Sequence, residues 1–157
     1  MPAPMSGRNR YSMIERHVLT ALQSLAQAKN RSLFSVLIGI YGLTLWRAGL
    51  GPRQSIGLPV GLRPGGYDNA VGMFVNTQIC RFDIESADTV DSYLDRVDTE
   101  VSRMREHHDV AFEHTVADLR DTGQFGAPFD TMFVLENTHY ALPGLTARYV
   151  PPSEVDP

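Results

Sequence analysis

Two neighbouring histidines and an aspartate, His107-His108-Asp109, are the residues best suited to chemistry in this chain. Such side chains can ligate a metal, or pair a general base with the carboxylate that orients it. Adjacent residues of a helix point about 100° apart, whereas one helix supplies two ligands to an ion at a spacing of four residues. The spacing therefore favours a plainer interpretation, in which these cations end an amphipathic helix and hold no metal.

The single cysteine, Cys80, is the other candidate for a reactive group. It lies between Ile79 and Arg81 in a segment with strand character, where a small buried apolar residue is commoner than a nucleophile. One cysteine also excludes an intramolecular disulfide framework and a cysteine-rich zinc site. We interpret Cys80 as structural, and its reduced state fits a reducing compartment.

Two polar residues, Asn76 and Thr77, interrupt the otherwise apolar segment 71–81. Buried amides and hydroxyls need hydrogen-bond partners. Either these side chains bind a neighbouring loop, or they line a channel and hold a polar substrate. No complete catalytic constellation accompanies them, so the residues alone predict no catalytic group.

The elements that must position these residues follow from hydrophobic spacing and from helix and turn signals. Apolar residues recur every three or four positions from Met13 to Ala28, Ser32 can cap a following apolar helix, and Asp88-Thr89 can begin a third. The sequence predicts helices over 13–28, 33–48, 88–108 and 111–119 and strands over 54–59, 71–82, 129–135 and 145–150. The predicted fold class is α/β, with a loose arm over 1–11 and a tail over 151–157.

Length, composition and charge narrow the possible functions. The chain has 157 residues, enough for one domain with a core, and a formal charge of -4, which does not favour nucleic-acid binding. The most apolar stretch, 33–46, contains polar and glycine residues and is shorter than the roughly 20 residues that span a bilayer. We see no targeting segment and expect a cytoplasmic protein without a membrane anchor.

A series of motifs resembles the condensation domains of nonribosomal peptide synthetases. Val71-Gly72-Met73-Phe74-Val75-Asn76-Thr77, followed by Arg81, is similar to a core motif of that family, and the segments 56–63, 108–113 and 129–137 are similar to other motifs in the same order. The resemblance covers about nine tenths of the chain. Ala111 replaces the usual proline and His108 the usual glutamine.

The resemblance implies a particular fold. The family has two lobes in the chloramphenicol-acetyltransferase-like fold, and residues 12–150 match the C-terminal lobe, a partial fold in which a mixed sheet packs against helices. The family's catalytic His-His-x-x-x-Asp-Gly motif belongs to the N-terminal lobe and is not in this sequence, because Phe112 and Glu113 stand where the Asp-Gly would follow His107-His108.

The resemblance also implies a function for the complete domain. It forms an amide bond between acyl or peptidyl and aminoacyl thioesters, acyltransferase-type chemistry of secondary metabolism that makes peptide antibiotics or siderophores. The implied partners are the N-terminal condensation lobe, a peptidyl carrier protein with its phosphopantetheine arm, and neighbouring synthetase domains. No cofactor is expected to bind this chain directly, and it should be inactive alone.

Site residues are expected by the same resemblance. Asn76 and Thr77 would be polar tunnel-side or lobe-organising residues. The others would be structural, with Arg63, Arg81 and Glu113 as an ion-pair set; they are Arg63, Gly72, Phe74, Arg81, Asp109, Phe112 and Glu113.

Other functions remain open at this point. The chain could be a non-catalytic module, derived from a condensation domain, that docks a carrier protein or a neighbouring domain. An acyltransferase of the same fold acting on coenzyme A thioesters is a further alternative, and the epimerisation and heterocyclisation relatives are less favoured. A single lobe should also expose an apolar face larger than a few hundred Å², which predicts self-association or a partner chain.

Overall fold

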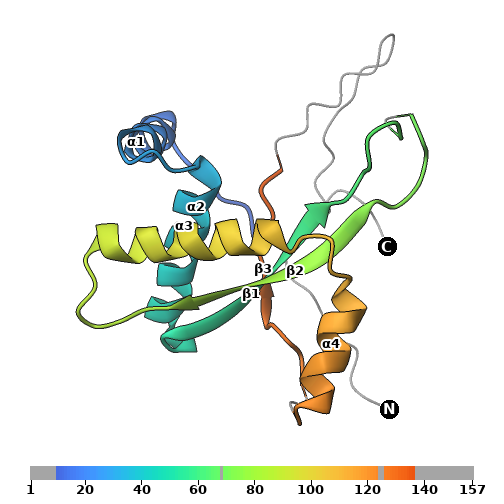
Figure 1. Cartoon of the computed structure of the whole chain (residues 1–157). Helices are drawn as coiled ribbons and strands as arrows, with labels where there is room; N and C mark the ends of the chain where they lie inside the picture. Colours follow the sequence, from blue (N-terminus) through green and yellow to red (C-terminus); the bar gives the residue numbers. More distant parts are fainter. Residues whose placement is uncertain (1–9, 68, 124–125, 137–157) are drawn as a thin grey trace.

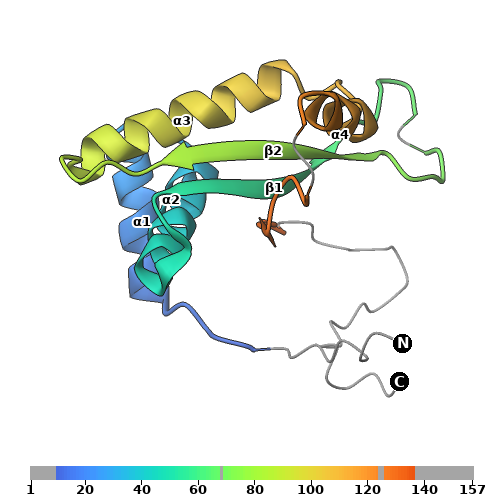
Figure 2. The same cartoon turned by 90° about the horizontal axis from the view of Figure 1, so that it is seen from below.

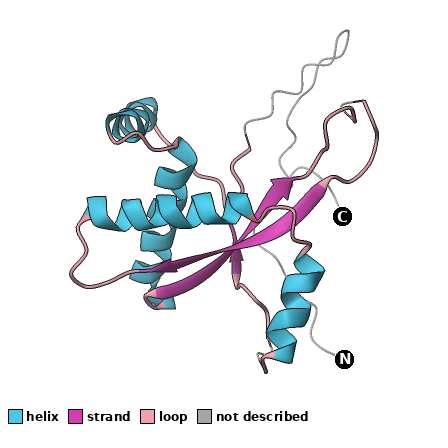
Figure 3. Ribbon diagram, in the orientation of Figure 1, coloured by secondary structure: helices cyan, strands magenta, loops and turns pink. Residues whose placement is uncertain are grey.

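The computed structural model describes residues 10–67, 69–123 and 126–136. Two helices come first, a β-hairpin follows, and two further helices precede a short last strand (Figures 1 and 3). The elements are α1 Arg16–Ala28, α2 Leu33–Leu45, the π-helix η1 Trp46–Leu50, β1 Arg53–Gly61, β2 Val75–Asp83, α3 Val90–Glu106, α4 Phe112–Asp121 and β3 Thr131–Met132. The predicted α/β class and the mixed sheet packed against helices are confirmed.

Among the described residues, the sheet has three strands in the order β2-β1-β3. β1 and β2 pair antiparallel along their full length, from Arg53 opposite Asp83 to Gly61 opposite Val75. β3 pairs parallel to β1 at two positions only, with Thr131 beside Ile56. In the part of the chain that the structure describes, β2 is therefore one edge of the sheet, and Figure 2 shows it between β1 and α3.

One face of the hairpin carries the hydrophobic core. Side chains of a strand alternate between faces, and the side chains of β1 and β2 that are buried on this face belong to even-numbered positions: Gln54, Ile56, Leu58, Asn76, Cys80 and Phe82. α3 presents a stripe of apolar residues to this face and also packs on α2. The buried core consists of Ile38, Ile56, Leu58, Cys80, Phe82, Ile84, Tyr93, Leu94, Val97, Val101 and Met104.

Two glycines of α2 let α3 approach closely. A Cβ at Gly39 would lie 2.8 Å from Leu94, and one at Gly42 would lie 2.7 Å from the hydroxyl oxygen of Tyr93. That hydroxyl donates to the carbonyl of Gly39 at 3.0 Å, and burial raises the pKa of Tyr93 to about 12. Tyr93 is therefore a neutral donor that joins α3 to α2.

The helix starts follow the sequence signals. Ser32 caps α2 by accepting from the Ser35 amide at 3.0 Å. Thr89 and Ser92 form a reciprocal capping box at the start of α3. Both starts were predicted, because short hydroxyl side chains before an apolar periodic run satisfy amides that a helix leaves unpaired.

Several predicted boundaries were wrong. The first helix begins at Arg16 rather than Met13, and the strand predicted over 71–82 begins only at Val75. The strand predicted over 129–135 is ladder-paired only at Thr131–Met132, whereas the first strand extends beyond the predicted 54–59 at both ends. The strand predicted over 145–150 lies outside the described residues.

The second helix is not one continuous rod. By length and composition alone the segment Leu33–Leu50 could cross a membrane. The helix departs from regular geometry at Gly49, whose φ is 94°, and η1 replaces its last turn. At 1.5 Å per residue, the 13 residues of α2 extend about 20 Å, short of the roughly 30 Å hydrocarbon core. The helix packs against α3, as expected of a core helix.

Candidate functional site: a strand that clamps a helical turn

Asn76 joins β2 to the turn between α3 and α4. Its amide nitrogen donates to the carbonyls of His108 at 3.1 Å and Val110 at 2.7 Å. Its amide oxygen accepts from the N–H groups of Thr77 at 2.9 Å and Phe112 at 3.1 Å. These four bonds use both donors and both acceptor sites of the side chain, which is 9% exposed. Of the two interpretations from the sequence, binding a neighbouring loop is the one that Asn76 fulfils.

The same side chain caps α4 from outside the helix. The N-cap residue of α4 is Ala111, which provides no side-chain acceptor. The Asn76 oxygen takes the N–H of Phe112, the first residue of α4. A helix N-terminus leaves such amides unpaired, so a residue of β2 performs the task that Ser32 and Thr89 perform within their own segments.

Gln78, which the sequence did not single out, supports this clamp. It lies two positions along β2 from Asn76 and therefore on the same face. Its amide nitrogen lies 3.3 Å from the carbonyl oxygen of His108 and 3.0 Å from that of Val110, the two acceptors that Asn76 also uses. The signal that could have found it is the period of two, which pairs a second amide with Asn76.

Thr77 points to the other face of β2. It is half-buried, and its hydroxyl has no hydrogen-bond partner among the described residues. Its neighbour across the sheet is Pro59, and Ile79 follows on the same face. The two polar residues that the sequence grouped together therefore differ: Asn76 binds the α3–α4 turn, whereas the hydroxyl of Thr77 is available for a contact.

Arg63, Gly72 and Phe74 come together in the connection between β1 and β2. The guanidinium of Arg63 lies 4.2 Å from the centroid of the Phe74 ring and donates to the carbonyls of Tyr67 and Ala70 at 2.7 and 2.8 Å. A Cβ at Gly72 would lie 3.3 Å from the Phe74 ring. These contacts hold the β1–β2 connection together, and the structural role expected of the three residues stays a prediction.

The expected ion-pair set is not present. Arg63 is occupied by carbonyls and an aromatic ring, Arg81 is exposed on β2 opposite Ser55, and Glu113 is exposed at the start of α4. No ion pair joins them in the described part of the chain.

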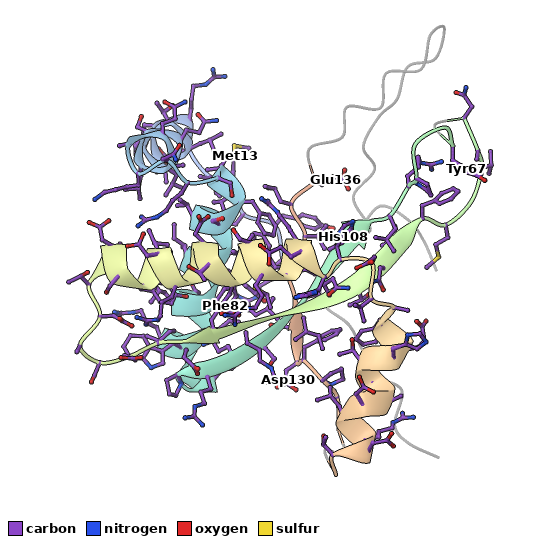
Figure 4. The ribbon with its side chains drawn as sticks, in the orientation of Figure 1. Met13, Tyr67, Phe82, His108, Asp130 and Glu136 are labelled. Atoms are coloured by element: carbon purple, nitrogen blue, oxygen red, sulfur yellow. The ribbon has the colours of Figure 1, made fainter. Side chains whose placement is uncertain are left out.

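The reactive-looking residues have structural surroundings. α3 ends at Glu106, and His108 lies at the turn towards α4 (Figure 4), where its Nδ1 is 2.7 Å from the carbonyl of Arg105. Asp109 is exposed beside it. Over the described ranges, no three His, Cys, Asp or Glu residues gather as a metal site would require. The interpretation of the histidines as a helix end is confirmed.

Cys80 is a core residue. It is 2% exposed, and burial raises the pKa of its thiol to about 12. The thiolate is the nucleophilic form, so at neutral pH the side chain behaves as a small apolar group. The structural interpretation of Cys80 is confirmed.

Comparison with known proteins now adds to this geometry. The family model of the condensation domain matches residues 5–149. The chain belongs to the condensation-domain family. Relatives include a protein of Salinispora arenicola described as a probable non-canonical nonribosomal peptide synthetase, CymA, which is 32% identical over 94% of this chain. Another is tyrocidine synthase 3 of Brevibacillus parabrevis, which is 31% identical over 87%.

Solved structures agree with the fold. A four-domain nonribosomal peptide synthetase, holo-AB3403 bound to AMP and glycine, matches 81% of this chain with a TM-score of 0.72 and 25% identity. The first condensation domain of the calcium-dependent antibiotic synthetase matches 72% with a TM-score of 0.58 and 21% identity. The fold is thus that of the chloramphenicol-acetyltransferase-like condensation domains.

The chain is small beside these relatives. It spans 2% of the length of each of the two synthetases named above and 10% of the four-domain structure. It spans 24% of the chain of the solved condensation domain.

Proposed function

We propose that this chain is the C-terminal half of a condensation domain that forms amide bonds between carrier-bound thioesters. In that reaction the amine of the downstream aminoacyl thioester attacks the upstream acyl thioester. A C–N bond forms, the C–S bond breaks, and the proton lost by the amine balances the released thiolate. The sequence lacks the His-His-x-x-x-Asp-Gly motif, so the role proposed for this half is to hold tethered substrates, the proximity part of catalysis.

One observation carries the proposal most directly. The motif's asparagine, Asn76, lies in β2, and three of its four hydrogen bonds go to the turn before α4 and to the first residue of that helix. The strand and α4 are thereby held in one arrangement. A rigid surface formed by β2 and α4 suits a lobe that positions substrates without reacting with them.

Thr77 is the residue of β2 best placed to contact substrate. Its hydroxyl is not used by the described part of the chain, and the apolar side chains of Pro59 and Ile79 adjoin it. A phosphopantetheine arm carries two amides, which methylene groups connect, and a carbon with two methyl groups. A hydroxyl beside apolar side chains fits such an arm. We propose that the arm of a peptidyl carrier protein passes this face and that Arg63, Phe74 and Phe112 act only through the fold.

Reconstitution tests this function. The chain is mixed with an N-terminal condensation lobe that carries the histidine motif and with two carrier proteins loaded with acyl and aminoacyl groups. Amide product should form only when both lobes are present, and Thr77→Val should lower the rate while leaving the melting temperature nearly unchanged. Turnover by the isolated chain, or no product from the reconstituted pair, would contradict the proposal.

The exposed apolar residues favour a second candidate, a docking module. The most exposed of them lie before α1 and in the β1–β2 connection: Met13 at 92% exposed, Val71 at 104% and Met73 at 89%. Such side chains are typical of a surface that another protein covers, either a missing lobe, a carrier protein or a second copy.

Titration with a phosphopantetheinylated carrier protein separates the two candidates. A docking module should show NMR shifts with the carrier protein alone, whereas a half-domain should need the N-terminal lobe first. Sedimentation of the isolated chain tests the self-association that we propose for an uncovered face. Both candidates place the protein in the cytoplasm, among the other domains of a synthetase.

A further inference from the structure

The strand β2 has an outer edge that no described element pairs. Two bonds that extend the hairpin ladder, Leu62 N–H to the Phe74 carbonyl and Ile84 N–H to the Pro52 carbonyl, involve directly opposite residues. In an antiparallel pair, hydrogen-bonded positions alternate. The even-numbered residues of β2 therefore point their backbone groups to β1, and the odd-numbered ones point theirs outwards.

The odd-numbered backbone groups that have partners agree with this assignment. The Thr77 N–H donates to the Asn76 side chain, and the Asp83 carbonyl accepts from Arg96 at 3.1 Å. Between these two ends, the N–H and the carbonyl of Ile79 and the carbonyl of Arg81 have no partner in the described part of the chain. An edge of this kind is a template for a further strand.

Hollows on two sides of this edge could receive the side chains of such a strand. One, of about 420 Å³, lies between β2 and α3 and is lined by Arg81, Phe82, Tyr93, Arg96, Glu100 and Arg103 among others. The other, of about 340 Å³, lies towards β1 and shares Arg81, Phe82 and Asp83 with the first. Because side chains of a strand alternate, a strand added along the edge would place successive residues in each hollow in turn.

The charges around the edge select acidic side chains. Four guanidiniums line the two hollows, those of Arg53, Arg81, Arg96 and Arg103, against the carboxylates of Asp83 and Glu100. Arg103 pairs with Glu100 at 3.0 Å, Arg53 pairs with Asp83 at 3.6 Å, and Arg96 pairs with Asp88. Arg81 has no ion-pair partner in the described residues, and the buried Nε of Arg96 has no acceptor. The edge is thus locally positive in a chain whose formal charge is -4.

We propose that the outer edge of β2 from Thr77 to Asp83, with α3 beside it, binds an extended acidic polypeptide segment by strand addition. The segment hydrogen-bonds to the backbone of Ile79 and Arg81, and a carboxylate on it pairs with the Arg81 guanidinium. Backbone bonds supply the affinity, and the carboxylate sets the register. This surface does not depend on the proposed amide-forming function, because neither Thr77's side chain nor a second lobe takes part.

A peptide series on the unchanged chain tests the proposal. The probe is a nine-residue peptide of alternating threonine and valine with a central glutamate. Matched peptides carry lysine at the centre, or N-methyl groups on alternate amides. The amide resonances of Ile79 and Arg81 should shift with the glutamate peptide, the lysine peptide should bind about tenfold more weakly, and the N-methylated peptide should not bind. No shift at millimolar glutamate peptide, or equal binding of the N-methylated form, overturns the proposal.

Two variants sharpen the result. Arg81→Glu should reverse the preference to the lysine peptide, while the matched control Arg16→Glu, at an exposed arginine of α1, should leave it unchanged. Ile79→Pro removes an outward N–H without touching a bond to β1, and it should abolish binding. If Arg16→Glu weakens binding of the glutamate peptide as much as Arg81→Glu does, the attraction is a general effect of charge, and the proposal is overturned. If the unchanged chain forms a dimer and Ile79→Pro abolishes it, the edge binds a second copy of this chain, which also overturns the proposal.

Discussion

The two halves of β2 are held to the rest of the molecule by different forces. In the first half, Asn76 and Gln78 point towards the α3–α4 turn and bind it through amide hydrogen bonds. In the second half, Cys80 and Phe82 point to the same face and belong to the core. Figure 4 shows Phe82 there. One strand face thus changes from polar to apolar contacts within seven residues.

The difference teaches where each force is useful. Apolar burial is non-directional and stabilises in proportion to the area removed from water, so it suits the long contact with α3. The α3–α4 turn offers backbone carbonyls and an unpaired N–H, which apolar side chains would leave unsatisfied at a cost. An amide can satisfy donors and acceptors together, and it fixes a position more closely than packing does.

The largest loss of stability should come from the apolar half. Phe82→Ala removes a ring that is 3% exposed and leaves a cavity beneath α3. We expect the free energy of unfolding to fall by about 3–5 kcal/mol. Urea unfolding followed by circular dichroism measures it, and a loss below that of Asn76→Ala would reverse the order of the two halves.

Asn76→Ala should have a smaller and more local effect. It leaves the Phe112 N–H without its acceptor while Gln78 still reaches the two carbonyls, so we expect a loss of about 1–3 kcal/mol. Hydrogen exchange should show faster exchange in α4 and unchanged protection at Cys80.

A matched control is available for this substitution. Asn69→Ala changes an exposed asparagine and should alter stability by less than about 0.5 kcal/mol. Equal exchange rates in α4 for Asn76→Ala and the unchanged chain would mean that the clamp does not hold the helix.

Gln78→Ala should cost less than Asn76→Ala, because Asn76 alone still serves both carbonyls. We expect a loss of about 0.5–1 kcal/mol. The double substitution should then cost more than the sum of the single ones, since the turn loses its last partner. A strictly additive double-mutant cycle would show that the two amides do not share a task.

The weakest expected effect is a pH dependence at the apolar end of β2. Arg96 pairs with Asp88 and lowers the pKa of that carboxyl to about 2 from an ordinary value near 3.8. The folded state therefore binds this proton less readily than the unfolded state. The contribution of this ion pair to the free energy of unfolding is present above pH 4 and is lost as the pH falls towards 2. Chemical unfolding between pH 5 and 2 measures it, and Asp88→Asn should flatten that part of the profile.

Sequence reasoning found those features that depend on neighbours along the chain. The capped starts of α2 and α3 and the buried thiol of Cys80 depend on local spacing and residue type. The outcome at Asn76 was left open between two roles, because its partners lie 32 to 36 residues away. Gln78 was missed for the same reason. The expected ion pairs among Arg63, Arg81 and Glu113 are not seen in the described residues, because a motif does not show how far apart its charges lie in space.

The weak pairing of β3 has a consequence for how the lobe folds. Residues 56 and 131 pair although they are 75 positions apart in the chain, whereas the hairpin of β1 and β2 and its contact with α3 are nearly local. Closing so long a loop costs conformational entropy, and the pairing of only two positions compensates for little of that cost. We therefore expect β3 to join last, its arrival marked by the Phe129 ring settling over Gly57, where a Cβ would be only 2.7 Å away. A nascent chain that has not yet emerged as far as β3 could already contain a folded hairpin with its helices.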